Sequence, residues 1–152
     1  MSLKELYQEI ILDHGKKPRH HGRLDQPSHC HEGHNPLCGD QLMLYIKTAN
    51  DKIDDICFEG KGCAISIASA SIMSETVKGK TLSEVYLLFD RFHHLVTGKF
   101  KEEKEADIGK LSVFSGVAEF PIRIKCATLA WHTLKAALAD ASQQPATTET
   151  SL

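Results

Sequence analysis

Residues 38–63 read CGDQLMLYIKTANDKIDDICFEGKGC. Within this stretch, apolar side chains alternate with polar ones over 41–48 and again over 53–59, which is typical of two strands with one buried face. The turn-like residues Ala49-Asn50-Asp51-Lys52 lie between the two runs. The pattern therefore predicts a β-hairpin whose buried face carries Leu42, Leu44, Ile46, Ile56 and Phe58.

The hairpin brings two cysteines together. If its turn is centred between Asn50 and Asp51, antiparallel partners have numbers that sum to about 101, and Cys38 and Cys63 satisfy this relation. Asp40 can point to the same side as Cys38, because the side-chain period of a strand is two. We therefore expect Cys38, Asp40 and Cys63 at the open end of the hairpin.

Helices are expected around this hairpin. The apolar spacing predicts one from Leu3, one over Ala64–Lys78, one from Leu82 and a last one over Cys126–Ala139. The pairs Ser2/Glu5 and Thr81/Glu84 are capping boxes, which mark helix starts. Other segments lack clear periodicity: 13–37 is expected to be an ordered loop, 99–110 an exposed charged stretch and 111–120 a short helical turn. Residues 1–140 form one predicted domain, and 141–152 a disordered tail.

Composition restricts the class of protein. The chain has 152 residues, of which 41% are hydrophobic and 25% charged, and a net charge of −2, as expected of one ordinary globular domain. This balance gives no reason to expect nucleic acid or an anionic membrane as a partner. We find no secretory signal and no apolar run of the roughly 20 residues that span a bilayer. We therefore expect a cytoplasmic protein.

Five cysteines in a reducing compartment are expected to be metal ligands or catalytic groups rather than disulfides. Cys63 precedes one predicted helix and Cys126 begins another, and a helix N-terminus favours the thiolate. If the last helix meets the hairpin, Cys38, Asp40, Cys63 and Cys126 surround one point. These four ligands suit tetrahedral Zn²⁺. Arg123 and Lys125 could offset the surplus negative charge.

Other residues have simpler interpretations beside the functional ones. Cys57 fits a small buried hydrophobe. Cys30 lies in the segment His29-Cys30-His31-Glu32-Gly33-His34, which either binds a second metal or is a solvated loop. His93 and His94 are expected at the surface, and Asp40 could also be a turn residue that caps backbone N–H groups.

Three motifs resemble the SufU/IscU/NifU-N family of iron–sulfur cluster assembly proteins. They are Asn35-Pro36-Leu37-Cys38-Gly39-Asp40, Gly60-Lys61-Gly62-Cys63-Ala64-Ile65-Ser66 and Lys125-Cys126-Ala127-Thr128-Leu129-Ala130-Trp131. The chain is most similar to the SufU branch, because Lys125 stands where the IscU branch has a histidine. The segment Glu119-Phe120-Pro121-Ile122-Arg123 also replaces the chaperone-recognition segment of IscU.

The resemblance implies an α+β fold of the SufE/NifU-like type, with a small antiparallel sheet of about three strands and helices packed on one side. It also implies a partner, a pyridoxal-phosphate-dependent cysteine desulfurase of the SufS or IscS type, and downstream iron–sulfur acceptor proteins. Cys38 would then accept sulfur as a persulfide, while Asp40, Cys63 and Cys126 stay on the zinc and a histidine of the desulfurase takes the place of Cys38.

Three functions compete on this ligand set. The first is a zinc-dependent sulfur acceptor, a sulfurtransferase-like partner of the desulfurase. The second is a scaffold that builds a [2Fe–2S] cluster on the same residues, since thiolates bind both metals. A purely structural zinc site is the third and fits poorly, because it rarely needs an aspartate beside motif glycines.

Overall fold

The predicted hairpin is the centre of the fold. A computed structural model describes residues 2–100, 108–139 and 146–147, and in it β2 (Asp40–Ala49) pairs antiparallel with β3 (Lys52–Lys61). Ala49 pairs with Lys52, and both turn residues between them have positive φ, 53° at Asn50 and 61° at Asp51. This backbone is that of a type I′ turn, which matches the twist of the strands. The predicted turn centre is confirmed.

The register changes by one residue within the hairpin. Partner numbers sum to 101 at Thr48↔Ile53, as predicted, but to 102 from Lys47↔Asp55 onward, because a β-bulge lies between Lys47 and Thr48. A bulge adds one residue to one strand; here Asp54 and Asp55 follow each other between the buried Ile53 and Ile56, which interrupts the alternation of β3. The register at this end is therefore shifted by one residue, and Cys38 and Cys63 both flank the open end of the hairpin, as predicted.

A third long strand occupies part of the segment expected to be a loop. β1 (His29–Asn35) pairs antiparallel with β2 along its whole length, from His29↔Ile46 to Asn35↔Asp40. The expectation of a loop over 13–37 is therefore wrong for residues 29–35. The strand was not recognised because the inward side chains of β1 are histidine, glycine and asparagine rather than aliphatic ones. On its other side, β1 pairs in parallel with β4 (Ala146–Thr147), and the rest of the tail lies outside the described residues. The strand order is β3-β2-β1-β4.

The helices follow the predicted caps. They are α1 (Leu3–Lys16), α2 (Ala64–Val77), α3 (Leu82–Val96), the 3₁₀ segment η1 (Gly109–Glu119) and α5 (Pro121–Ala139). The Ser2 hydroxyl accepts the N–H of Glu5, and Thr81 and Glu84 form the full capping box. Of the stretch expected to be exposed, 101–107 lies outside the described residues, while Ile108 is buried.

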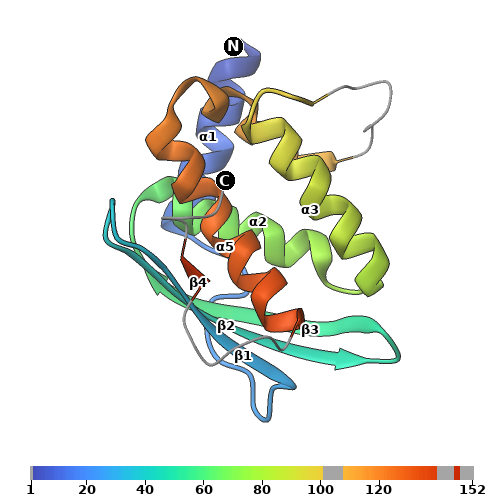
Figure 1. Ribbon diagram of the computed structural model, residues 1–152. Helices are drawn as coiled ribbons and strands as arrows, with labels where there is room; N and C mark the ends of the chain where they lie inside the picture. Colours follow the sequence, from blue (N-terminus) through green and yellow to red (C-terminus); the bar gives the residue numbers. More distant parts are fainter. Residues whose placement is uncertain (1, 101–107, 140–145, 148–152) are drawn as a thin grey trace.

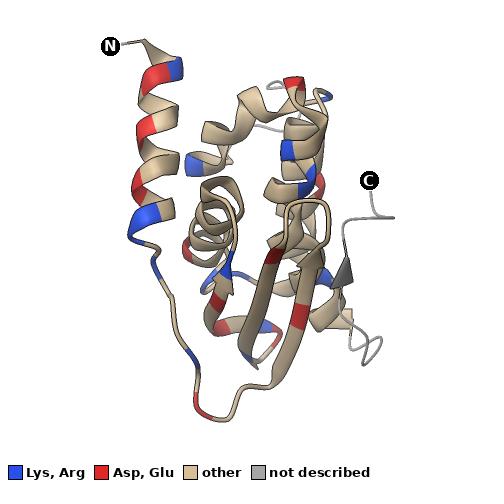
Figure 2. Ribbon diagram, turned by 90° about the vertical axis from the view of Figure 1, so that its left-hand side faces the viewer, with Lys and Arg blue, Asp and Glu red and all other residues tan. Residues whose placement is uncertain are grey.

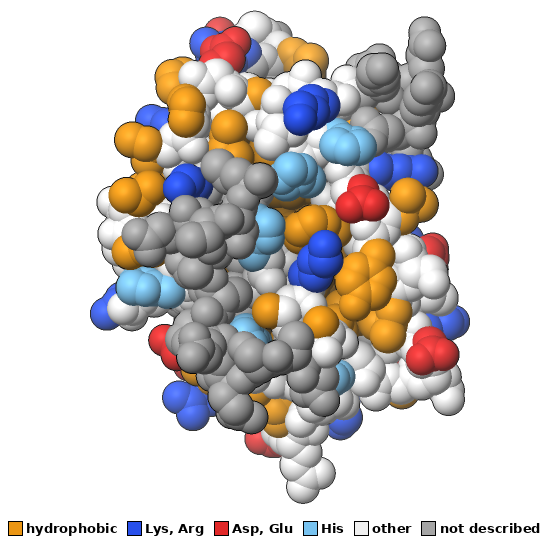
Figure 3. All heavy atoms as spheres, viewed as in Figure 1, with side chains coloured by type: hydrophobic (Ala, Val, Ile, Leu, Met, Phe, Trp, Pro, Cys, Tyr) orange, Lys and Arg blue, Asp and Glu red, His pale blue; other side chains and the backbone are white. Residues whose placement is uncertain are grey.

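All of these helices lie on one side of the sheet (Figure 1), as the fold class predicts. The core between the two layers combines the apolar face of the hairpin with α2 and α5, and the fully buried Phe58, Met73 and Trp131 are among its largest side chains. Charged residues are scattered along the ribbon in Figure 2, and in Figure 3 basic, acidic and hydrophobic side chains are mixed over one face. Within the described ranges, none of the helices has the length and apolar content that a membrane span requires.

A close contact joins α5 to the sheet. A Cβ placed on Gly33 of β1 would overlap Oγ1 of Thr133 and come within 3.2 Å of Cδ1 of Leu129, both on α5. The Thr133 hydroxyl is held by donating to the carbonyl of Leu129 at 2.7 Å. Glycine is therefore required at this position of β1, because the helix occupies the space of a side chain.

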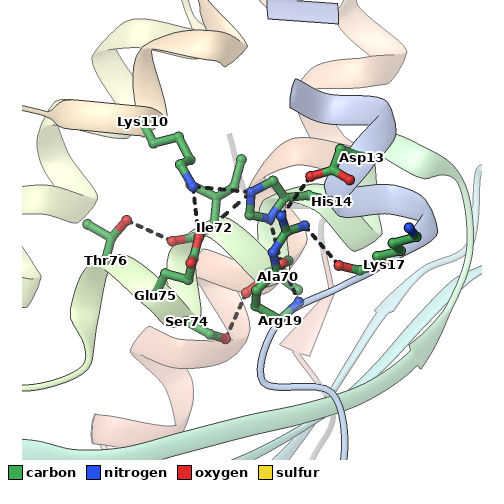
Figure 4. Close-up of polar contacts among 11 residues, drawn as sticks. Asp13, His14, Lys17, Arg19, Ala70, Ile72, Ser74, Glu75, Thr76 and Lys110 are labelled. Carbon is green, nitrogen blue, oxygen red and sulfur yellow. Dashed lines mark hydrogen bonds and ion pairs between the residues drawn. The ribbon is translucent and has the colours of Figure 1, made fainter. Parts of the chain in front are cut away.

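A buried histidine anchors α1 on α2 (Figure 4). Nδ1 of His14 lies 2.7 Å from Oγ of Ser71, and Nε2 lies 3.4 Å from Nζ of Lys110 and 3.7 Å from Glu75. Since the ammonium can only donate, Nε2 is the acceptor and the ring is neutral. The pKa of His14 is lowered, first by burial and then by the charge of Arg19. The same Ser71 hydroxyl also accepts the backbone N–H of Arg19, which fixes the chain as it leaves α1.

Candidate metal centre

Cys38 lies on the turn that joins β1 to β2. Asn35 and Asp40 are the last pair of the ladder, so residues 36–39 form the connecting loop, and Gly39 supplies its left-handed φ of 71°. The Cys38 side chain is exposed, next to Leu37, which is 61% exposed. The turn thus presents the first motif cysteine to solvent.

Asp40 is completely buried and links Asn35 at the end of β1 to Cys63, which follows β3. Its Oδ1 accepts the backbone N–H of Cys63 at 2.9 Å, and its Oδ2 accepts from Nδ2 of Asn35 at 3.1 Å. A Cβ on Gly62 would overlap Oδ1 and lie 2.9 Å from Cγ of Asp40, so glycine is needed for this approach. The carboxylate therefore has the backbone-capping contact that the simpler interpretation expects. Each carboxylate oxygen has further lone pairs, so these bonds do not prevent coordination.

Cys63 is the N-cap residue of α2. Its Sγ accepts the N–H of Ser66 at 3.4 Å. Contact with the Cys126 thiol and the N–H groups of Ser66 and Ile65 lower the pKa of Cys63 to about 6, against the opposing effect of burial. These contacts favour the thiolate form of Cys63, as expected for a thiol at a helix N-terminus.

Cys126 does not begin its helix. Proline is favoured in the first turn, because its missing N–H has no intrahelical partner there, and α5 starts at Pro121. Cys126 thus lies in the second turn and is only 2% exposed. Its pKa is raised, chiefly by its hydrogen bond to the Cys63 sulfur and then by burial. The expectation that Cys126 begins its helix is wrong, because α5 starts five residues earlier, at Pro121.

Three of the four predicted ligands lie at one place, and Cys63 lies beside them. Sγ of Cys126 lies 3.3 Å from Sγ of Cys38, and the ligand atoms of Cys38, Asp40 and Cys126 are all within 4.8 Å of one another. Cys63 joins them through its contact with Cys126 and its N–H bond to Asp40. Two thiolates on one tetrahedral zinc ion lie roughly 3.8 Å apart, given Zn–S bonds of ~2.3 Å. The donor set therefore suits a thiolate-binding metal such as zinc or iron.

Asn35 belongs to this cluster, and the sequence analysis did not assign it a role. The side chain is fully buried, and Nδ2 faces both Oδ2 of Asp40 and, at 3.6 Å, Sγ of Cys126. Its presence in the motif Asn35-Pro36-Leu37-Cys38-Gly39-Asp40 was the available signal. Asn35 orients two of the candidate ligands at once.

The two predicted cations lie near the start of α5. The Arg123 guanidinium lies over the Phe120 ring, 5.4 Å from its centroid, and lines a hollow of about 490 Å³ between α1 and η1. Lys125 is half-buried directly before Cys126. Charge compensation by Arg123 and Lys125 stays a prediction.

The chain is thus a helical layer on a small, mainly antiparallel sheet, with three thiols and a carboxylate near one end of the sheet. The chain belongs to the family of the NifU-like N terminal domain, whose model matches residues 6–127. The family membership and the α+β fold expected from the motifs are confirmed.

Named relatives cover almost the whole chain. The iron–sulfur cluster assembly scaffold protein IscU of Streptococcus pyogenes is 44% identical over 90% of this chain and 84% of its own. The zinc-dependent sulfurtransferase SufU of Bacillus subtilis is 40% identical over 91% of this chain and 92% of its own. The crystal structure of a SufU from Fervidobacterium islandicum, described as an iron–sulfur cluster assembly scaffold for the SUF system, has a TM-score of 0.80 and 38% identity, and the match covers 90% of this chain and 99% of that one. The chain is therefore similar to proteins of iron–sulfur cluster assembly.

Proposed function

We propose that this protein is a zinc-binding sulfur acceptor that takes persulfide sulfur from a cysteine desulfurase in the cytoplasm. Asp40, Cys63 and Cys126, together with Cys38, would hold the metal. A bound zinc ion would keep the thiols deprotonated and protected from oxidation. The name of the B. subtilis relative agrees with this chemistry.

The observation that carries the proposal is the difference in exposure among the ligands. Asp40 is 0% and Cys126 2% exposed, whereas Cys38 is exposed on a four-residue turn. The Cys63 sulfur is held at the N-terminus of α2 by the N–H of Ser66. Cys63 is exposed as well, but of the two exposed thiols only Cys38 lies on a turn, where it can meet a second protein.

The transfer itself needs no oxidant. The Cys38 thiolate attacks the terminal sulfur of the desulfurase persulfide, the sulfur–sulfur bond of that persulfide breaks, and the desulfurase cysteine leaves as a thiolate. One sulfur–sulfur bond forms and one breaks, so atoms and electrons balance. Exposed Leu37 beside Cys38 is a candidate contact for the desulfurase.

A cluster scaffold is the second candidate, and the three converging thiols favour it as well. The S. pyogenes relative carries the scaffold description. Metal and acid-labile sulfide content after anaerobic purification distinguishes the two functions. Zinc without sulfide supports the acceptor, and iron with sulfide supports the scaffold.

The decisive variant is Cys38→Ala, with Cys30→Ala as its matched control, since both cysteines are exposed. Cys38→Ala should abolish stimulation of a cysteine desulfurase and the mass increase of one sulfur atom on the Cys38 peptide. Cys30→Ala should retain both. Undiminished stimulation by folded Cys38→Ala protein would rule out the acceptor role.

A further inference from the structure

A second group of metal-ligating side chains lies away from the Cys38 site. Ligand atoms of His20, Asp55 and Cys57 are all within 4.8 Å of one another, and all three residues are half-buried. Asp55 and Cys57 are two residues apart on β3, so they point to the same face of the sheet. Their neighbours Ile56 and Phe58 are fully buried on the opposite, helix-covered face. The cluster therefore lies on the face of the sheet that the helices leave open.

The backbone holds His20 beside the strand. The Phe58 N–H donates to the carbonyl of His20 at 3.0 Å, and the Gly22 N–H donates to the carbonyl of Phe58 at 2.8 Å. This pairing extends the sheet beyond β3 for one bridge, His21↔Phe58. Arg19 is fixed in turn by Ser71 and by an ion pair with Asp13 (Figure 4). His20 is thus positioned from both sides.

His20 also has an unusual backbone conformation. Its φ is +60°, in the left-handed region that residues with a side chain seldom adopt and that costs roughly 1–2 kcal/mol. The hydrogen bonds on either side maintain this conformation, which turns the ring toward Asp55 and Cys57. Such an outlier, maintained by its surroundings, is a feature that often marks a binding site.

Asp55 is oriented toward the same point. Its Oδ1 accepts the N–H of Ile56 at 2.9 Å and forms an ion pair with Nζ of Lys78 at 3.3 Å. Both contacts use the same oxygen, so Oδ2 can coordinate a cation while Lys78 and the backbone hold the carboxylate.

We propose that His20, Asp55 and Cys57 form a second metal site that binds a divalent cation of the zinc class, with water completing the coordination. An imidazole nitrogen, a carboxylate oxygen and a thiolate are the ligand types that Zn²⁺ and Co²⁺ accept. One carboxylate and one thiolate balance the charge of a +2 ion, and the Cys57 proton passes to solvent as the sulfur–metal bond forms. Ligand atoms around tetrahedral zinc lie roughly 3.5 Å apart, so side-chain rotations that move the ligand atoms by about an ångström bring them to coordination distance.

This assignment replaces the simpler interpretation of Cys57 as a buried hydrophobe. The structure places Cys57 half-buried on the open face rather than in the core. It also offers another location for the second metal site that one of the two interpretations placed in the segment 29–34. Within His29–His34, the Cys30 thiol instead lies 3.5 Å from the sulfur of Met43.

The test is zinc content after equilibrium dialysis of the full chain against Zn²⁺, with elemental analysis. Cys57→Ser and His20→Gln should each bind one zinc fewer per chain than the wild type, whatever the Cys38 site contains. Loss of a ligand should weaken binding by more than about 100-fold, since even an outer partner of a ligand contributes 10–100-fold. The matched controls Cys30→Ser and His21→Gln should equal the wild type.

A second readout is the near-ultraviolet absorption of Co²⁺ bound to a thiolate. The part of this absorption that comes from Co²⁺ at the second site should be absent in Cys57→Ser and present in Cys30→Ser. Circular dichroism checks that each variant is folded, and His20→Gln, in a connecting segment, serves if Cys57→Ser does not fold. Equal metal content in the wild type and His20→Gln, or a loss in Cys30→Ser instead of Cys57→Ser, would overturn the proposal.

Discussion

Replacement of Gly62 by alanine should displace the buried carboxylate of Asp40. The new Cβ would overlap Oδ1 and approach Cγ to 2.9 Å and the Asp40 Cα to 3.1 Å. The backbone of Asp40 cannot readily retreat from the new Cβ, so the carboxylate has to move. The movement breaks its hydrogen bonds to the Cys63 N–H and to Nδ2 of Asn35.

The size of the effect follows from these two bonds. A hydrogen bond to a charged group contributes about 1.5–3 kcal/mol, and partial relaxation of the loop recovers some of the loss. We expect the free energy of unfolding to fall by about 3 kcal/mol. For a chain of this size, each kcal/mol shifts Tm by roughly 2–4 °C, so Tm should fall by roughly 6–12 °C.

The assay is thermal unfolding of the metal-free protein, followed by circular dichroism, with zinc affinity measured in parallel. Gly116→Ala is the matched control, because a Cβ at exposed Gly116 meets nothing within 4 Å. A Gly62→Ala protein that unfolds within 2 °C of the wild type and binds zinc equally would refute the reasoning that Asp40 is clamped against Gly62.

Two further predictions concern zinc and pH. Removal of zinc by a chelator should lower Tm, because a ligand that binds only the native state stabilises it, and an unchanged Tm after verified removal would contradict this. Because the folded-state pKa of His14 lies below its usual 6.5, unfolded chains take up its proton first as pH falls. This group contributes stability above pH 6.5 that is lost below it, by at most about 1.4 kcal/mol per pH unit. Denaturant titrations should show a smaller loss between pH 6.5 and 5.5 in His14→Gln than in the wild type; equal losses would contradict the assignment.

The sequence predicts the hairpin well and β1 poorly, for a physical reason. In β2 and β3 the inward positions carry aliphatic and aromatic side chains, so the alternation is visible. In β1 the corresponding positions are His29, His31, Gly33 and Asn35, and the strand forms through its pairing with β2 and its contact with α5. Such tertiary causes leave no periodic signal in the segment itself.

The candidate site was predictable as a set of residues but not as a geometry. The motifs name Cys38, Asp40, Cys63 and Cys126; the structure groups the ligand atoms of Cys38, Asp40 and Cys126 and places Cys63 beside them. The bulge in β3 and the start of α5 at Pro121 determine how they meet, and neither entered the predicted geometry. Asn35 stands in the first motif, but its contacts, like the cluster around His20, join distant segments and are seen only in the structure.

The contact between Gly33 and Thr133 has a mechanical consequence for the metal centre. Because Thr133 occupies the space that a side chain at position 33 would fill, α5 packs directly against the backbone of β1 at this point. Cys126 lies about two turns earlier on the same rigid helix, roughly 10 Å away at 1.5 Å per residue. Gly33, which is not itself part of the metal centre, thus helps to set the distance from the sheet at which the sulfur of Cys126 meets the other ligands.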